Sequence, residues 1–183
     1  MNLSRLAPLA AAFALLSPIS ASAELPVGAK APTFAAHGAL GGKPYEFALK
    51  SALKRGPVVL YFYPKAFTKG CTLEAHAFAE ASDDFKSAGA TVIGMSNDDV
   101  PTLQRFSTEA CRDKFAVASA TPDVIKAYDV ELKREGLPPG LTNRTSYVIA
   151  KSGKIVLVHS DLDYRDHVKL TLDAVKALKA KKG

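Results

Sequence analysis

Two apolar runs in the middle of the chain predict buried strands. VVLYFY occupies residues 58–63 and ATVIGMS occupies residues 90–96. Both runs place apolar side chains at successive positions, which is typical of strands that are covered on both faces. Gly56-Pro57 marks the start of the first strand, because glycine and proline commonly separate one element from the next. We therefore expect a sheet with at least two central strands.

Polar and apolar positions at helical spacing predict four helices around these strands. The predicted helices cover residues 72–87, residues 100–111, a segment that begins at Thr121, and residues 165–179. Asp98 and Asp99 are expected to cap the second helix, because carboxylates favour the positive end of the helix dipole. Thr121 precedes a proline, which suits the first position of a helix. Cys111 is expected late in the second helix.

Shorter patterns complete the predicted fold. Residues 33–36 and 45–47 are strand candidates, and residues 145–150 and 154–160 flank the turn Lys151-Ser152-Gly153 as a hairpin. Strands joined through a helix pair in parallel, whereas a hairpin pairs antiparallel. The prediction is one α/β domain with a mixed central sheet flanked by helices on both faces. This order resembles the thioredoxin fold with an N-terminal extension.

The first 23 residues have the pattern of a secretory signal peptide. Arg5 precedes an apolar run from Leu6 to Leu16, and Ala21-Ser22-Ala23 provides a small-residue cleavage site. The run is too short to span a bilayer. Since no lipid-attachment cysteine follows it, we expect cleavage rather than a membrane tether. The predicted mature domain, residues 24–183, would be exported without stable membrane insertion, most simply to a bacterial periplasm.

Charge and cysteine usage narrow the possible functions. The 183 residues carry a net charge of +6, but the lysines are scattered or gathered in the tail KALKAKKG. This pattern predicts a solvated basic surface and no nucleic-acid partner. Cys71 and Cys111 are 40 positions apart, which matches no compact zinc motif, so no metal is expected. In an oxidising compartment they could form a structural disulfide or a working thiol pair.

The segment YFYPKAFTKGCTLEAH, residues 61–76, places Cys71 at the start of a predicted helix. Side chains that follow a central strand reach the carboxyl edge of the sheet, where α/β proteins place their sites. Free N–H groups and the helix dipole favour the thiolate of a cysteine there. Thr68 is near enough in a tight turn to contact the sulfur. Pro64 ends the strand without an N–H and can shield the pocket from water.

Pro64, Thr68 and Cys71 form the pattern P-x-x-x-T-x-x-C, which resembles the active-site motif of the peroxiredoxins. VVLYFYPKAFTKGCTLEA, the strand TVIGMS followed by a helix, and NRTSYVIAKSGKI resemble the peroxiredoxin Q branch, also called bacterioferritin comigratory proteins. The resemblance covers most of the chain from about Val27 onward. It implies a thiol-dependent peroxidase that reduces hydrogen peroxide and organic hydroperoxides and needs no cofactor.

The resemblance also implies a role for each matching residue. Cys71 would be the peroxidatic cysteine, Thr68 would orient the peroxide, and Pro64 would limit solvent access. Arg144 would stabilise the thiolate and the reacting oxygens, and Glu74 would position Arg144. A thiolate attacks one peroxide oxygen while negative charge builds on the departing oxygen, so donors aimed at that oxygen lower the barrier. Cys71 then becomes a sulfenic acid.

Two positions depart from the family pattern. Lys69 stands where the family usually has proline, which predicts a less rigid turn, and His76 stands where many members have a resolving cysteine. Some members of the branch resolve from the following helix, so the resemblance implies a Cys71–Cys111 disulfide in the oxidised form. Bridging requires Cα atoms within ~7 Å, so the first turn of the Cys71 helix is expected to unwind.

The resemblance leaves the partners of the reaction less defined. A thioredoxin-like protein or another thiol is the expected electron donor, and the branch suggests a monomer. If Cys111 cannot reach Cys71, the enzyme would act with one cysteine and an external thiol.

Two other functions fit part of the pattern. An exported thiol–disulfide oxidoreductase normally carries C-x-x-C, whereas Cys71 is followed by Thr72-Leu73-Glu74. A non-catalytic thioredoxin-like domain could instead hold a structural Cys71–Cys111 bridge, with Thr68 as a turn residue and Arg144 as a surface charge. Rapid loss of the Cys71 thiol on addition of one equivalent of peroxide would separate the peroxidase from both.

Overall fold

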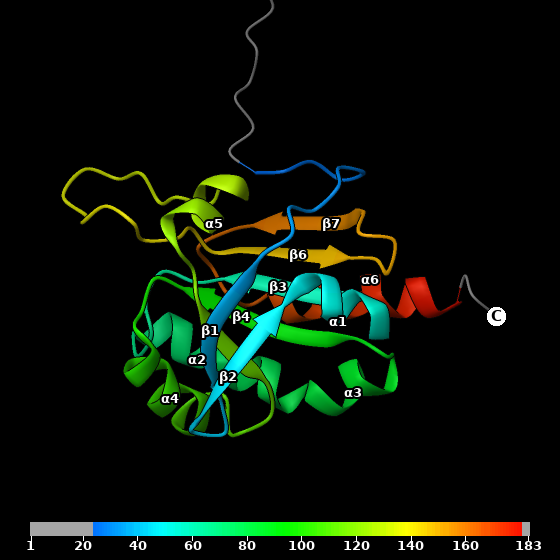
Figure 1. Ribbon diagram of the computed structural model, residues 1–183, viewed down its shortest axis with the longest axis horizontal. Helices are drawn as coiled ribbons and strands as arrows, with labels where there is room; N and C mark the ends of the chain where they lie inside the picture. Colours follow the sequence, from blue (N-terminus) through cyan, green and yellow to red (C-terminus); the bar gives the residue numbers. More distant parts are fainter. Residues whose placement is uncertain (1–23, 181–183) are drawn as a thin grey trace, which may run out of the picture.

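The computed structural model describes residues 24–180, and the predicted signal peptide lies outside the described residues. In this part of the chain, seven strands form one sheet in the order β2-β1-β5-β4-β3-β6-β7 (Figure 1). The strands are β1 (Ala35–Leu40), β2 (Lys43–Ala48), β3 (Val58–Phe62), β4 (Thr91–Ser96), β5 (Ala116–Ser119), β6 (Thr145–Ile149) and β7 (Ile155–Ser160). The helices are α1 (Leu49–Arg55), α2 (Lys69–Glu80), α3 (Ser82–Ser87), α4 (Val100–Glu109), α5 (Pro122–Ala127) and α6 (His167–Ala180).

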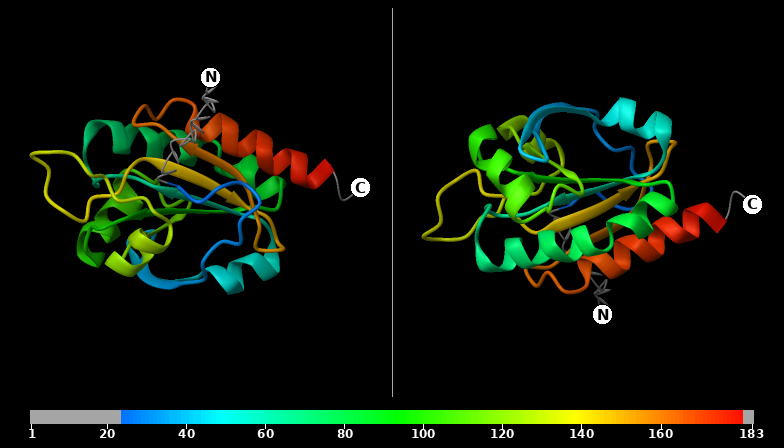
Figure 2. Two further views of the ribbon diagram at one scale, coloured as in Figure 1. Left: turned by 90° about the horizontal axis from the view of Figure 1, so that it is seen from above. Right: turned by 90° about the horizontal axis from the view of Figure 1, so that it is seen from below.

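The central strand β3 explains the uninterrupted apolar run. Val58, Leu60 and Phe62 belong to one buried core, and Val59 and Tyr61 belong to the other. Helices α1 and α5 cover the first face, and α2 and α6 cover the second (Figure 2). β3 pairs in parallel with β4 and antiparallel with β6. The mixed sheet with helices on both faces, predicted from the sequence, is confirmed.

Two elements carry too little sequence signal to be predicted. β5 is four residues long and consists of small side chains, AVAS, yet it pairs in parallel with β4 and antiparallel with β1. Helix α1 has seven residues, fewer than two full turns. Neither segment is long enough for a periodicity to stand out. β5 joins the N-terminal hairpin to the central strands. The position of this hairpin in the sheet is therefore set by strand pairing between distant segments and not by a local sequence pattern.

Two predicted helix boundaries are corrected by the structure. The first helix begins at Lys69, and the predicted continuous helix is divided at Ala81 into α2 and α3. The second ends at Glu109, so placing Cys111 inside that helix was wrong. The residues after Cys111, Arg112 and Asp113, have φ of 51° and 59°. A right-handed helix cannot continue through such residues.

Candidate active site

Cys71 is the third residue of α2, directly beyond the carboxyl end of β3. Thr68 has an extended backbone, with φ −74° and ψ 149°, and occupies the N-cap position. Its carbonyl accepts the first helical bond from Thr72 N–H at 2.9 Å. The Cys71 side chain is almost fully buried, with an exposed fraction of 2%. The sulfur therefore lies within the first turn, among the free amides and the positive end of the helix dipole.

Arg144 reaches this sulfur from the strand next to β3. Thr145 pairs with Phe62, so the residue before β6 arrives beside the loop that follows β3. Arg144 Nη2 donates to Cys71 Sγ at 3.5 Å, and Arg144 Nε donates to the Leu162 carbonyl at 2.9 Å. The guanidinium is held at two points, which orients a planar set of donors toward the thiol.

Glu74 holds the other side of the same guanidinium. Its Oε2 accepts from Arg144 Nη1, and its side chain is fully buried. Glu74 follows Cys71 by three residues, a spacing that puts both side chains on one face of α2. Burial raises the pKa of Glu74 to about 8, although the charge of Arg144 acts in the opposite direction. The structure thus brings Cys71, Arg144 and Glu74 together in one buried cluster.

Thr68 and Pro64 lie in the loop that leads into the helix. Thr68 is exposed, and its Oγ1 donates to the Lys65 carbonyl at 2.9 Å. Because this bond uses the hydroxyl hydrogen, the oxygen is left as an acceptor. Among the hydrogen bonds of the described residues, none joins Thr68 Oγ1 to Cys71 Sγ. Pro64 is half-buried at the start of the loop.

Cys111 is a second free thiol, fully buried in the same apolar cluster as Cys71. Tyr61 and Tyr63 belong to that cluster and their hydroxyls have no hydrogen-bond partner among the described residues. Burial raises the pKa of the Cys111 thiol, and the charge of Asp113 adds to this effect. In this fold Cys111 is therefore kept as a neutral thiol.

Asp98 has a role at the site that sequence reasoning missed. It was expected to cap the second helix, but the cap is Asp99, which accepts from Thr102 N–H at 2.8 Å. Asp98 Oδ2 instead accepts from Ala66 N–H at 2.7 Å and from the Ser96 hydroxyl at 2.8 Å. This carboxylate ties the end of β4 to the loop before Cys71. In the sequence, only the position of Asp98 just after a central strand indicated that its side chain could lie near the site.

Gly70 is the second residue that the sequence analysis missed. A Cβ added at this position would lie 3.2 Å from Arg144 Nη2. The missing side chain gives the guanidinium room to approach the start of α2. Glycine is a poor helix former, so helix propensity does not explain its presence in the first turn of α2. The close approach of Arg144 does explain it.

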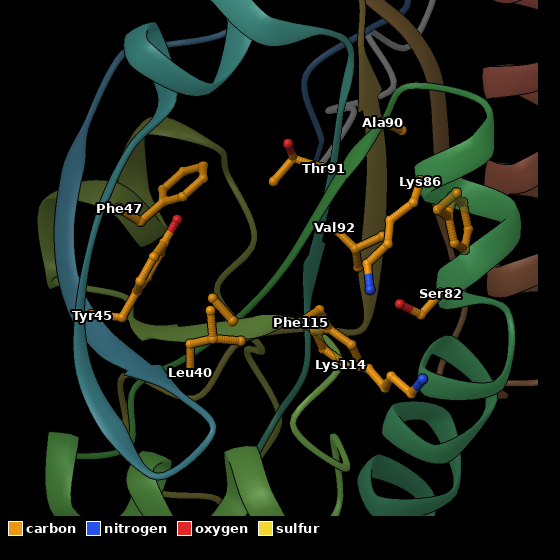
Figure 3. A pocket seen from close by; sticks show the side chains of 12 residues that line it. Leu40, Tyr45, Phe47, Ser82, Lys86, Ala90, Thr91, Val92, Lys114 and Phe115 are labelled. Carbon is orange, nitrogen blue, oxygen red and sulfur yellow. The ribbon is translucent and has the colours of Figure 1, made fainter.

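A hollow between side chains lies away from Cys71. This cavity of about 190 Å³ opens near the beginnings of β4 and β5 (Figure 3). Aromatic and lysine side chains line it, including Tyr45, Phe47, Phe85, Lys86, Lys114 and Phe115.

The described residues include no cluster of three metal-ligating side chains. Among the described helices, none has the length and apolar character to cross a membrane.

Residues 27–158 match the AhpC/TSA family. The chain belongs to this family. It is 34% identical over 149 residues to the chloroplastic peroxiredoxin Q of Populus jackii, covering 75% of this chain and 68% of that protein. The peroxiredoxin Q of Sedum lineare is 33% identical, with 76% and 78% covered. This AhpC/TSA protein is thus a thiol-dependent peroxidase related to the peroxiredoxin Q branch.

Solved structures support the same relationship. Peroxidoxin BcpB of Mycobacterium tuberculosis is 30% identical and superposes with a TM-score of 0.71, covering 82% of this chain and 96% of that one. The bacterioferritin comigratory protein of Xanthomonas campestris is 28% identical with a TM-score of 0.67, covering 78% and 91%. The thioredoxin-like fold of a peroxiredoxin, expected from the sequence, is confirmed.

Proposed function

We propose that Cys71 is the peroxidatic cysteine of this peroxidase. Its thiolate attacks one oxygen of a hydroperoxide, an S–O bond forms and the O–O bond breaks. The departing alkoxide or hydroxide takes a proton to leave as alcohol or water, and Cys71 becomes a sulfenic acid. The observation that carries the proposal is Arg144 Nη2 at 3.5 Å from Cys71 Sγ, at the start of a helix.

The neighbouring groups have complementary tasks in this reaction. The Arg144 guanidinium and the amides of the first turn of α2 stabilise the thiolate and the charge that builds on the departing oxygen. Thr68 Oγ1, left as an acceptor by its bond to the Lys65 carbonyl, orients a peroxide O–H. Pro64, half-buried in the loop, limits the access of water. Glu74 holds Arg144 in place from behind.

Hydrogen peroxide and organic hydroperoxides are the proposed substrates. The related bacterioferritin comigratory protein of Xanthomonas campestris has alkyl peroxide reduction activity. In this chain, Phe67 and Leu73 are exposed apolar side chains just before and just after Cys71 in sequence. Leu73 is two residues from Cys71 and so faces another side of α2, whereas Phe67 in the loop before the helix offers apolar surface that favours an alkyl group over a fully polar substrate.

The sulfenic acid is resolved by Cys111 in our proposal. Its thiol attacks Cys71 sulfur, a disulfide forms and water leaves. Both sulfurs are buried, and burial raises the pKa of Cys111, so this step requires Cys111 to leave its pocket and the first turn of α2 to unwind. A thioredoxin-like protein or another thiol then reduces the disulfide. If Cys111 stays buried, an external thiol resolves Cys71 directly.

A single-turnover experiment tests the assignment of Cys71. Reduced protein receives one equivalent of hydroperoxide, and thiol loss is followed by rapid quench and mass spectrometry. We expect rapid modification of Cys71 in the unmodified protein and no peroxide consumption by Cys71→Ser. Modification of Cys111 first, or a rate equal to that of free cysteine, would refute the assignment.

The same experiment on Cys111→Ser tests resolution. We expect one normal turnover, followed by accumulation of sulfenic or over-oxidised Cys71 when an excess of peroxide is added. Unimpaired repeated turnover of this variant with a dithiol reductant would assign resolution to the external thiol.

Export to a bacterial periplasm and a monomeric state belong to the same proposal. The pattern of residues 1–23 supports export and cleavage after Ala23. N-terminal sequencing of the protein from the periplasmic fraction should begin at Glu24, and an uncleaved cytoplasmic product would contradict export. Light scattering should give the mass of one chain in both the reduced and the oxidised state, and a larger mass would contradict the monomer.

A further inference from the structure

One carboxylate oxygen at the centre of the site is buried without a hydrogen bond. Glu74 Oε2 contacts Arg144, but Oε1 has no hydrogen-bond partner among the described residues. The imidazole of His167 faces it, with Nδ1 at 3.7 Å, and both side chains are fully buried. An unpaired charged oxygen in such a place is costly. A proton between these two groups would remove that cost.

The other contacts of His167 fix the state of its ring. His167 is the first residue of α6, and its Nε2 lies 2.9 Å from the Asp161 carbonyl. A carbonyl only accepts, so Nε2 carries the hydrogen. In the neutral ring, Nδ1 is then an acceptor, and it lies 2.8 Å from the Ser146 hydroxyl. Nδ1 has a single lone pair, so it accepts a proton shared with Glu74 when the Ser146 hydroxyl turns its hydrogen away.

The location of that proton changes the charge next to Cys71. With Glu74 ionised, two anions, the Cys71 thiolate and the carboxylate, share one buried guanidinium. With Glu74 protonated, the full charge of Arg144 acts on the sulfur. We propose that His167 is a positioning residue of the peroxidatic site, which holds one proton together with Glu74 and so leaves the charge of Arg144 to Cys71. This inference rests on the proposed function of Cys71.

The charges around the pair support one shared proton rather than two. The groups that face His167 from the neighbouring elements are Glu74 of α2, Arg144 before β6, His159 of β7, and Asp161 and Asp163 after β7. Burial lowers the pKa of His167 to about 4; His159 and Arg144 act in the same direction, and Asp161 opposes them. Since burial raises the pKa of Glu74 to about 8, the pair keeps one proton between these limits.

Glu74→Gln is the first test, because a glutamine amide mimics a protonated carboxyl group in shape and hydrogen bonding. The second-order rate constant of Cys71 oxidation is measured from pH 5.5 to 9. We expect the variant to stay within about threefold of the unmodified protein up to pH 7, and to become about tenfold faster than it by pH 9. Glu80→Gln, an exposed change on the same helix, should follow the unmodified protein throughout.

His167→Asn is the second test. The asparagine amide always offers donors, which favour the ionised form of Glu74. We expect this variant to react about tenfold more slowly at pH 7, and the double variant with Glu74→Gln to recover to within about threefold. A purely structural role of His167 would not allow this rescue. His37→Asn, at an exposed histidine of β1, serves as the matched control.

The outcomes separate this proposal from the function on which it rests. An unmodified protein whose Cys71 reacts no faster than free cysteine contradicts both. A rapidly reacting protein in which Glu74→Gln loses more than tenfold at pH 7, or in which the double variant stays slow, contradicts only the role of His167. If circular dichroism shows that His167→Asn does not fold, the pH profile of Glu74→Gln alone decides.

Discussion

Arg144 Nη2 lies 3.5 Å from Cys71 Sγ, although the two residues are 73 positions apart in the chain. The contact exists because β6 pairs with β3, which brings the residue before β6 to the loop that follows β3. The register of one strand pair thus places the cation beside the thiol. A shift of this register by one residue would turn the Arg144 side chain to the other face of the sheet.

Arg144→Lys should greatly reduce the reactivity of Cys71. A lysine ammonium is a point charge that cannot contact Glu74 and Cys71 as a planar fork. We expect the second-order rate constant with hydroperoxide to fall about 100-fold, the typical effect of removing one donor to a developing oxyanion. Stopped-flow competition for hydroperoxide measures it. Arg134→Lys, at an exposed loop position, should leave the constant unchanged. A loss below threefold in Arg144→Lys would contradict direct participation.

Lys69→Pro should stabilise the fold. Lys69 is the first residue of α2, and Thr68 before it has φ −74° and ψ 149°, a conformation that a following proline accepts. We expect the free energy of unfolding in urea to rise by about 0.5 kcal/mol, because proline restricts the unfolded chain.

Thr72→Pro is the matched control for this change. Thr72 N–H donates to the Thr68 carbonyl at 2.9 Å, so proline there removes a helical hydrogen bond. It should destabilise the protein by about 3 kcal/mol. Equal effects at both positions would show that the start of α2 differs from the one described.

Gly70→Ala should separate stability from activity. Alanine favours the helix by up to about 1 kcal/mol, but its Cβ would lie 3.2 Å from Arg144 Nη2 and displace the guanidinium. We expect thermal unfolding at an equal or higher temperature, together with a rate constant for Cys71 oxidation several-fold below that of the unmodified protein. Thr72→Ala tests helix propensity on the same helix. Full activity in Gly70→Ala would mean that Arg144 tolerates the displacement.

In the Glu74→Gln variant, where the opposing titration of Glu74 is removed, stability should depend on His167 at acid pH. Burial lowers the pKa of His167 from 6.5 to about 4, so the unfolded chain binds this proton first. The stabilisation is complete above pH 6.5 and is lost as the pH falls through about 4. The lost free energy is about 3 kcal/mol.

Urea unfolding from pH 4 to 7 measures this dependence. The difference in unfolding free energy between Glu74→Gln and the double variant with His167→Asn should shrink as the pH falls, because Glu74 is absent from both and the other titrating groups are common to both. A difference that stays constant with pH would contradict a neutral buried His167.

The sequence alone determined the elements that local patterns encode. The apolar run of β3, the Thr121 cap of α5 and the position of Cys71 at a helix start could all be predicted, because side-chain periodicity and capping act within a few residues. The P-x-x-x-T-x-x-C pattern pointed to the family for the same reason.

Tertiary structure alone decided what surrounds the sulfur. Asp98 fastens the loop instead of capping a helix, Cys111 lies beyond α4, and His167 faces Glu74 from the far end of the chain. None of these relationships leaves a local pattern, because each depends on which strands pair, in which register, and on how the helices pack over them. The position of Cys71 at a helix start is encoded locally, whereas the electrostatic environment of its sulfur is assembled by contacts between distant segments.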